Sequence, residues 1–185
     1  TGMIAASVLA LSGCATKSAA NKGNTAGSTI KIGVNMELSG AVAGYGEQEK
    51  QGVELAVKQI NAAGGIKVGN SKKKITAIYR DNKSSTSGAA SVAAQLANSD
   101  KAVAIVGPAT TNDGTASIPN VTKAGVPMVG PSATDPNFTL QKNGSVQKYV
   151  FRACFTDAFQ GEKAAVFAND TLKAKNIAII ADNST

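Results

Sequence analysis

The residues of this chain best suited to ligand chemistry are hydroxyl side chains that directly follow short apolar runs. The apolar run at 103–107 is followed by Pro-Ala-Thr-Thr at 108–111, and the run at 126–130 by Pro-Ser-Ala-Thr at 131–134. Hydroxyl and backbone N–H groups can donate to a carboxylate, and hydroxyl and carbonyl oxygens can accept from an ammonium group. These two segments therefore favour binding of a zwitterion by groups that carry no formal charge.

Two different roles are also open to these hydroxyl side chains. Ser, Thr and Asn commonly cap helices and close turns, so each of them could serve only its own local structure. A Ser or Thr nucleophile would instead need an activating base, and the chain contains no His. Lys or a carboxylate would have to take that role, and no G-x-S-x-G or S-x-x-K motif stands at the end of a predicted strand. A hydrolase is therefore the weaker alternative, and we expect the protein not to be an enzyme.

Composition argues against several other kinds of site. The absence of His removes most zinc sites and Ser-His-Asp triads. No Gly-Lys-Ser/Thr phosphate loop occurs, and Gly44-Tyr45-Gly46 is a poor dinucleotide fingerprint because Glu49 occupies the third glycine position. The net charge of +7 comes mostly from lysines spread along the chain without interleaved aromatics, which favours attraction to an anionic envelope over nucleic-acid binding. We therefore expect no cofactor, no metal and no nucleic-acid partner.

The loops that carry the hydroxyl groups must be positioned by the strands and helices around them. Apolar patterns predict strands at 29–36, 74–81, 102–107, 126–130, 149–152 and 176–182. Helical spacing predicts helices that end at 64–65, lie within 84–100, and span 112–125 and 158–172. Such alternation forms right-handed βαβ units with a parallel sheet, and ligands bind outside the carboxyl ends of its strands. Loops 38–47, 108–112 and 131–135 should therefore converge at one edge of the sheet.

The first residues of the chain resemble a lipoprotein signal. Residues 1–14 contain an apolar stretch too short to span a bilayer and end in Leu-Ser-Gly-Cys, similar to a bacterial lipobox in which Cys14 is lipidated. Residues 15–28 hold no large apolar side chain, which is typical of a flexible tether. Acylation of Cys14 would leave Cys154 as a free, buried thiol.

Several segments, taken in order, resemble one protein family. The segment IKIGVNMELSGAVAGYGEQEKQGVELAVKQINAAGGI at 30–66 is similar to the opening of branched-chain amino-acid binding proteins of ABC transporters. YRDNKSSTSGAASVAAQL, AIVGPATT and GVPMVGPSATDP match in the same order, and YVFRACFTDAFQG is similar to the crossover into the second lobe. The resemblance implies an α/β, type I periplasmic-binding-protein fold, in which a lobe is a Rossmann-like parallel sheet with helices on both faces. It places lobe one at 29–148, and the crossover with the start of lobe two at 149–185, as an N-terminal fragment.

The resemblance also implies roles for individual residues. Thr111 would give its hydroxyl and N–H groups to the α-carboxylate of an amino acid, and Ser132 would offer its carbonyl to the ammonium group. Thr134 would contribute an N–H and a hydroxyl, and Tyr45 would line the apolar side-chain pocket. The wall of the site would be shaped by Ala109, Thr110 and Ala133.

The implied function is that of an extracytoplasmic solute-binding lipoprotein. It would capture a small amino acid, branched-chain by family, between two lobes and deliver it to the permease subunits of an ABC importer. Its lipid anchor would hold it at the outer face of the cytoplasmic membrane, or on the periplasmic side in a two-membrane cell. A sensory ectodomain of the same fold is an alternative, although a sensor usually needs a spanning helix rather than a lipobox. The ligand stays open, because relatives also bind amides and aromatic acids and some carry Ala where this chain has Ser132.

Overall fold

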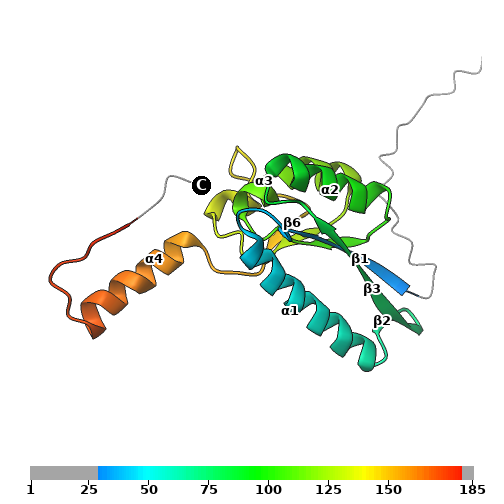
Figure 1. Ribbon diagram of the computed structural model, residues 1–185, viewed down its shortest axis with the longest axis horizontal. Helices are drawn as coiled ribbons and strands as arrows, with labels where there is room; N and C mark the ends of the chain where they lie inside the picture. The colour runs from blue at the N-terminus through cyan, green and yellow to red at the C-terminus, as the bar shows by residue number, and fades with distance from the viewer. Residues whose placement is uncertain (1–28, 181–185) are drawn as a thin grey trace, which may run out of the picture.

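The strands of the protein form one sheet flanked by helices, and the computed structural model describes residues 29–180 (Figure 1). The strands are β1 (Thr29–Met36), β2 (Ile66–Val68), β3 (Ser71–Asp81), β4 (Ala104–Val106), β5 (Met128–Gly130) and β6 (Val150–Arg152). The helices are α1 (Ala43–Ala62), α2 (Thr86–Asn98), α3 (Thr111–Ala124) and α4 (Asp157–Val166), with a short 3-10 helix η1 (Pro136–Thr139) and a π-helical turn η2 (Phe167–Thr171).

The strand order in the six-stranded sheet is β2-β3-β1-β4-β5-β6. β1 runs parallel to β3 on one side and to β4 on the other, and β5 and β6 continue in parallel. The predicted parallel sheet is therefore confirmed. β2 is the exception, because it pairs antiparallel with the start of β3 across the turn at Gly69-Asn70. No strand was predicted at 66–68, since a strand as short as β2 shows no recognisable period in the sequence.

Helices cover both faces of the sheet, as predicted (Figure 1). α1 packs on one face, where Val34 and Met36 of β1 form a small cluster with the half-buried Val53 of α1. α2 and α3 lie side by side on the other face and cover the larger cluster. Buried members of that cluster from the helices and strands include Leu96, Val121, Ile105 and Met128. Because helices cover both faces of the sheet, a ligand would have to bind at an edge where the strands end.

A buried polar network fixes the carboxyl end of β1 against the two helices on the larger face. Asn35 is fully buried, and its Nδ2 donates to the Ala89 carbonyl of α2 at 3.0 Å and to Ser117 Oγ of α3 at 3.4 Å. Asn82 Nδ2, after β3, donates to Asn35 Oδ1 at 3.2 Å. Buried amides are costly unless they are hydrogen-bonded, so this network holds three elements in one arrangement at the edge where the loops converge.

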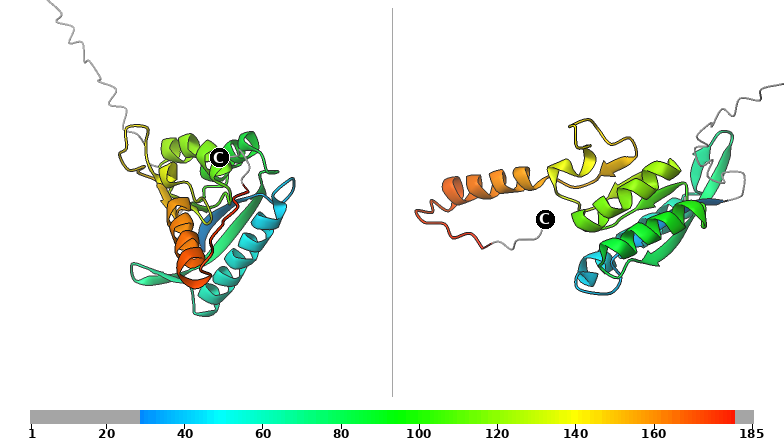
Figure 2. Two further views of the ribbon diagram at one scale, coloured as in Figure 1. Left: turned by 90° about the vertical axis from the view of Figure 1, so that its left-hand side faces the viewer. Right: turned by 90° about the horizontal axis from the view of Figure 1, so that it is seen from above.

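The segment after β6 extends away from the sheet (Figure 2). No residue of α4 is buried. The strand predicted at 176–182 is not formed over residues 176–180, where Ile179 and Ile180 are 87% and 99% exposed. A strand needs a neighbour to pair its N–H and C=O groups, and residues 176–180 pair with none of the described strands. The apolar pattern was therefore misleading here, because it shows that a segment is suited to a sheet but not that a partner is present.

Three predictions at the start of the chain concern the signal segment 1–14, Cys14 within it and the tether 15–28, and they lie outside the described residues. Among the described residues, no helix has the length and apolar character needed to cross a membrane. Cys154 is a free thiol in this part of the chain, as predicted, but it is half-buried rather than buried. Burial raises its pKa, with a smaller opposing influence of Arg152.

Candidate ligand-binding site

The predicted loops lie at one edge of the sheet, because β1, β4 and β5 are adjacent and parallel. We call this the carboxyl edge, since these strands end there. Two contacts join its loops. The N–H of Asp135 donates to Thr111 Oγ1 at 3.4 Å, and the hydroxyl of Ser132 donates to a carboxylate oxygen of Glu49 in α1. Thr111, Ser132 and the start of α1 are thus brought together.

Glu37, which directly follows β1, organises the loop after β4. Its side chain is fully buried. Oε2 accepts the N–H of Ala109 at 3.0 Å, and Oε1 accepts both the N–H and the hydroxyl of Thr110, each at 3.1 Å. Negative charge is favourable here because these donors stand at the N-terminus of α3. The N–H groups of Ala109 and Thr110 are consequently engaged by the protein itself.

The two adjacent threonines serve different purposes. Thr110 is the N-cap of α3, and its Oγ1 accepts the N–H of Asp113 at 3.4 Å. Thr110 therefore caps the helix, which was one of the two other roles open to these hydroxyl side chains. Thr111 is the first residue of α3, so its N–H has no carbonyl acceptor within the helix. Its half-buried side chain faces the loop after β5 through the bond from Asp135, which leaves Thr111 placed at the rim of the carboxyl edge.

Asp113, in the first turn of α3, is a buried carboxyl group beside Glu37. The residue is only 5% exposed. Its pKa is raised from 3.8 to about 6, first by burial and then by the charge of Glu37 and a hydrogen bond with it, against a lowering by Thr110. Two carboxylates this close repel each other, and one proton held between them relieves the repulsion.

Glu49 links α1 to the loop after β5 through its bond from Ser132. Its other carboxylate oxygen, Oε2, is buried and has no hydrogen-bond partner among the described residues. Burial raises the pKa of Glu49, the bond from Ser132 lowers it, and the charge of Glu37 raises it, with a net upward shift. The hydroxyl of Ser132 therefore points into the protein, whereas the expected role of Ser132 toward a ligand concerns its carbonyl.

The loop after β5 is also held by the segment that follows it. Arg152 of β6 donates from Nη1 to the carbonyls of Asp135 at 2.6 Å and Ala133 at 3.4 Å. The N–H of Asp157, at the start of α4, donates to the carbonyl of Thr134 at 3.0 Å. Ala133 is fully buried. These hydrogen bonds fix the backbone of the loop and leave the half-buried Thr134 at the carboxyl edge.

The turn after β1 is fixed by Asp81, the last residue of β3. Its carboxylate accepts the N–H groups of Leu38 and Ser39 at 3.1 and 3.2 Å, the Ser39 hydroxyl at 2.6 Å and the Lys83 N–H at 2.8 Å. Burial opposes ionisation, but these hydrogen bonds outweigh it and lower the pKa of Asp81. The turn that leads into α1 is therefore anchored to β3 by a charged group.

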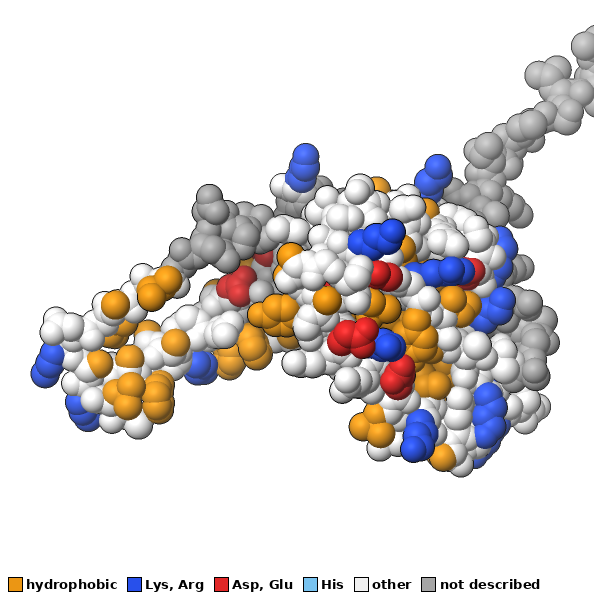
Figure 3. Space-filling model, viewed as in Figure 1, with side chains coloured by type: hydrophobic (Ala, Val, Ile, Leu, Met, Phe, Trp, Pro, Cys, Tyr) orange, Lys and Arg blue, Asp and Glu red, His pale blue; other side chains and the backbone are white. Residues whose placement is uncertain are grey.

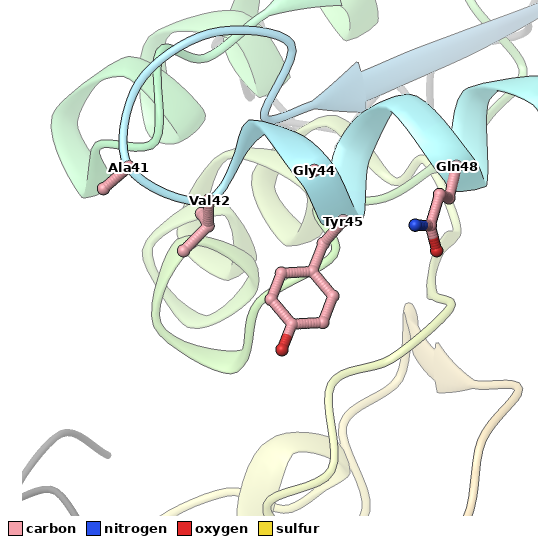
Figure 4. Close-up of a pocket in the computed structure, with 5 residues that line it drawn as sticks. All are labelled: Ala41, Val42, Gly44, Tyr45 and Gln48. Atoms are coloured by element: carbon pink, nitrogen blue, oxygen red, sulfur yellow. The ribbon is translucent and has the colours of Figure 1, made fainter.

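Tyr45 lies in the first turn of α1 and is 65% exposed. Figure 4 shows its ring and the amide of Gln48 projecting from the same side of α1, with Ala41 and Val42 nearby along the preceding turn. These residues line a shallow pocket with Gly44. A ring exposed to this degree has protein on one side only, so it is available for contact with a further molecule or lobe.

The structure refines the predicted site in two respects. Ala109 and Ala133 are 2% and 0% exposed, and their methyl groups belong to the buried clusters on opposite faces of the sheet, so they lie beneath the rim. The carboxyl groups of Glu37, Glu49 and Asp113 were missed by the sequence analysis. An acidic residue placed directly after an apolar strand, as Glu37 is, was the available signal.

No group of three or more His, Cys, Asp or Glu side chains in the described part of the chain is arranged to hold a metal ion. The site is therefore built from backbone groups, hydroxyl groups and single carboxylates.

A family model described as periplasmic binding protein matches residues 29–185. The chain belongs to the periplasmic binding protein family.

Individual relatives agree with this assignment. The chain is 32% identical over 184 residues to a Pseudomonas aeruginosa amino acid binding protein, covering 100% of this chain and 45% of the relative. It is 35% identical over 153 residues to the Brucella melitensis Leu/Ile/Val-binding protein homolog 3, covering 83% of this chain and 39% of the relative. A crystal structure of the Streptococcus pneumoniae branched-chain amino acid transporter substrate binding protein, in complex with isoleucine, matches with 46% identity and a TM-score of 0.71, over 80% of this chain and 40% of that one.

These periplasmic binding proteins are longer than the chain described here, which spans less than half the length of each of these three relatives. The relatives are binding proteins by name. Their likeness extends to the type I periplasmic-binding-protein fold, which confirms the predicted fold class.

Proposed function

We propose that residues 29–148 form the first ligand-binding lobe of an extracytoplasmic solute-binding protein of an ABC importer. The ligand would be a small, branched-chain amino acid. The observation that carries this proposal is the carboxyl edge, where three loops meet and offer hydroxyl groups and a helix N-terminus. Such an edge suits a zwitterion, since its carboxylate and ammonium groups can both be hydrogen-bonded at little cost in net charge.

We assign the ligand contacts as follows. Thr111 receives the α-carboxylate with its hydroxyl and with the N–H that α3 leaves without an acceptor. Thr134 adds an N–H and a hydroxyl, and the carbonyl of Ser132 accepts from the ammonium group. Tyr45 covers the apolar side chain. Ala109, Thr110 and Ala133 shape the wall from beneath, and Glu37 holds the backbone on which that wall depends.

The first lobe supplies only part of a complete site. Residues 149–185 form the crossover and the start of a second lobe, and closure of the two lobes buries the ligand between them. The ligand stabilises the closed state because only there does it contact both lobes. No bond is made or broken, so the protein acts by capture and release.

We also propose how the protein is held in the cell envelope. Cys14 is lipidated and becomes the first residue of the mature protein, and residues 15–28 tether the lobe to the membrane. The protein then lies at the outer face of the cytoplasmic membrane, or on the periplasmic side in a two-membrane cell, and passes its ligand to permease subunits.

Isothermal titration of the full-length protein with leucine, isoleucine and valine tests the assignment. Thr111→Ala should weaken binding at least tenfold, because it removes one hydrogen bond to a charged group. Thr115→Ala, on the exposed side of the same helix, is the matched control and should change the Kd less than about twofold. Equal affinities of wild type and Thr111→Ala would place the ligand elsewhere. If the full-length protein binds none of these amino acids, the proposal is wrong.

A further inference from the structure

Charged side chains are unevenly divided between the two edges of the sheet. The edge at which the parallel strands begin, here called the amino edge, includes the β2–β3 hairpin and the C-terminal ends of the helices. The lysines of this edge include Lys67, Lys72, Lys73, Lys74, Lys101 and Lys123. All of them are exposed except Lys73, which is half-buried. Figure 3 shows Lys and Arg side chains along the end of the molecule where β1 begins and the hairpin lies.

The carboxyl edge holds most of the carboxylates near the strand ends, although Lys83 and Arg152 also lie there. Its carboxylates include Glu37, Glu49, Asp81, Asp113 and Asp135. Asp100 is the carboxylate that the described residues place at the amino edge, and it is paired with Arg80 at 3.0 Å. The lobe therefore has a lysine-rich end at the amino edge and a mixed, carboxylate-bearing end at the carboxyl edge.

The positive charge of the hairpin is not neutralised within the fold. The ion pairs of the described residues do not include Lys67, Lys72 or Lys73. Lys72 Nζ donates to the Ala63 carbonyl at 3.3 Å, and Lys74 Nζ donates to the Asn61 carbonyl, both at the C-terminal end of α1. Carbonyl acceptors carry no formal charge, so the ammonium groups keep theirs and remain available to an external anion.

We propose that the amino edge, centred on the β2–β3 hairpin, docks on an anionic phospholipid bilayer. Each lysine that reaches such a surface strengthens partitioning about fivefold. Proteins that bind single-stranded nucleic acids stack the bases on aromatic side chains, and the hairpin from Ile66 to Lys74 has none. The polypeptide enters the fold at this edge, because Thr29 of β1 lies opposite Lys74 of β3. Docking therefore points the carboxyl edge away from the bilayer surface.

Vesicle sedimentation tests the proposal with the chain carrying Cys14→Ser, so that no acyl group contributes. The chain should bind vesicles of phosphatidylglycerol and phosphatidylcholine, and not vesicles of phosphatidylcholine alone. Raising the salt to about 1 M should abolish binding, because the Debye length falls to about 3 Å. K67Q/K72Q/K73Q should weaken binding at least tenfold. The control K83Q/K142Q/K175Q removes the same charge from exposed sites outside the amino edge and should weaken it less than about threefold.

The orientation of the docked chain is measured by energy transfer from a fluorophore on the protein to an acceptor on the lipid. The fluorophore is attached to a single cysteine, introduced either as Asn70→Cys in the hairpin turn or as Ala41→Cys at the carboxyl edge. Both variants also carry Cys14→Ser and Cys154→Ser, so that no other thiol is labelled. Transfer should be stronger from position 70. Equal loss of binding in both triple variants, stronger transfer from position 41, or no binding to anionic vesicles would overturn the proposal. Tighter binding to duplex DNA than to anionic vesicles at the same salt would show that the partner of the amino edge is a nucleic acid and not a bilayer. Amino-acid affinity of the full-length protein should be unchanged in K67Q/K72Q/K73Q, so this test is independent of the proposed ligand.

Discussion

At the scale of single residues, the site depends on carboxyl groups that do not touch the proposed ligand. Glu37 holds the N–H groups of Ala109 and Thr110, and Glu49 holds the hydroxyl of Ser132. Both carboxylates hold the loops whose hydroxyl groups are proposed to bind the ligand. A hydroxyl-rich loop can be recognised from its letters, but the carboxylate that orients it comes from a distant part of the chain and is found only when the fold is known.

Removal of Glu37 gives the first residue-scale prediction. Glu37→Ala leaves the N–H groups of Ala109 and Thr110 and the Thr110 hydroxyl without their acceptor. Each buried donor left unpaired costs about 1–3 kcal/mol, so the free energy of unfolding should fall by about 3 kcal/mol or more. Urea denaturation measures this loss. Glu54→Ala, on an exposed part of α1, is the control and should stay within about 0.5 kcal/mol of wild type. A loss no larger than that of the control would contradict the role given to Glu37.

Asp113 gives a prediction on pH dependence. Its pKa rises from 3.8 to about 6 on folding, through burial first and then through Glu37. The folded chain therefore holds this proton more tightly than the unfolded chain, and its contribution to the free energy of unfolding is largest below about pH 4. That contribution is lost as the pH rises through about 6.

Urea unfolding between pH 4 and pH 8 measures this effect, with Asp113→Asn as the variant that cannot titrate. The stability of wild type minus that of the variant should decrease as the pH rises from about 4 to about 6, and then level off. A flat difference for Asp113→Asn would mean that folding does not raise the pKa of this carboxyl group.

At the scale of elements, the first turn of α1 is positioned by a glycine. A Cβ at Gly46 would lie 2.2 Å from the carbonyl oxygen of Glu37, so any other residue would push α1 away from the carboxyl edge. Gly46→Ala should therefore destabilise the lobe by about 2 kcal/mol, since overpacking of this kind costs about 1–3 kcal/mol. Thermal unfolding measures it.

Gly52 supplies the matched control on the same helix. A Cβ there meets nothing within 4 Å. Gly52→Ala should raise the stability by about 1 kcal/mol, because Ala is the better helix former. Opposite signs for the two substitutions are the expected result. If Gly46→Ala is as stable as wild type, the close approach of α1 to Glu37 is absent in solution.

Elements with a long, regular apolar pattern were predictable, and elements that depend on a neighbour were not. β1, α2 and α3 follow from period-two or helical spacing, and Gly125 in the left-handed region ends α3 where expected. β2 was missed because three residues show no period. The strand expected from 176 onward is not formed over residues 176–180, since its apolar residues have no described strand to pair with. Of the site, the meeting of the loops was predictable from the parallel topology, whereas the depth of Ala109 and Ala133 was not.

At the scale of the whole molecule, the proposed mechanism divides the ligand contacts between two lobes, of which residues 29–148 would form the first. The exposed ring of Tyr45 and the exposed apolar residues of α4 and of residues 172–180 are consistent with surfaces that a second lobe would cover. The apparent affinity of one lobe should therefore be far lower than that of the complete protein. Every hydrogen bond and apolar surface that the second lobe supplies adds to the binding free energy, and a tenfold change in Kd corresponds to about 1.4 kcal/mol.

We expect the 185-residue chain to bind leucine at least about a hundredfold more weakly than the full-length protein, because in the proposed mechanism a second lobe adds hydrogen bonds and apolar cover to the ligand. Calorimetry on both proteins under identical conditions makes the comparison. Circular dichroism and urea unfolding of the short chain must first show a cooperative transition, so that weak binding is not simply loss of fold. Thr111→Ala should reduce affinity by the same factor in both proteins if Thr111 acts within the first lobe alone. Equal affinity of the short and long chains would mean that one lobe holds the whole site, and capture by closure would then have to be abandoned.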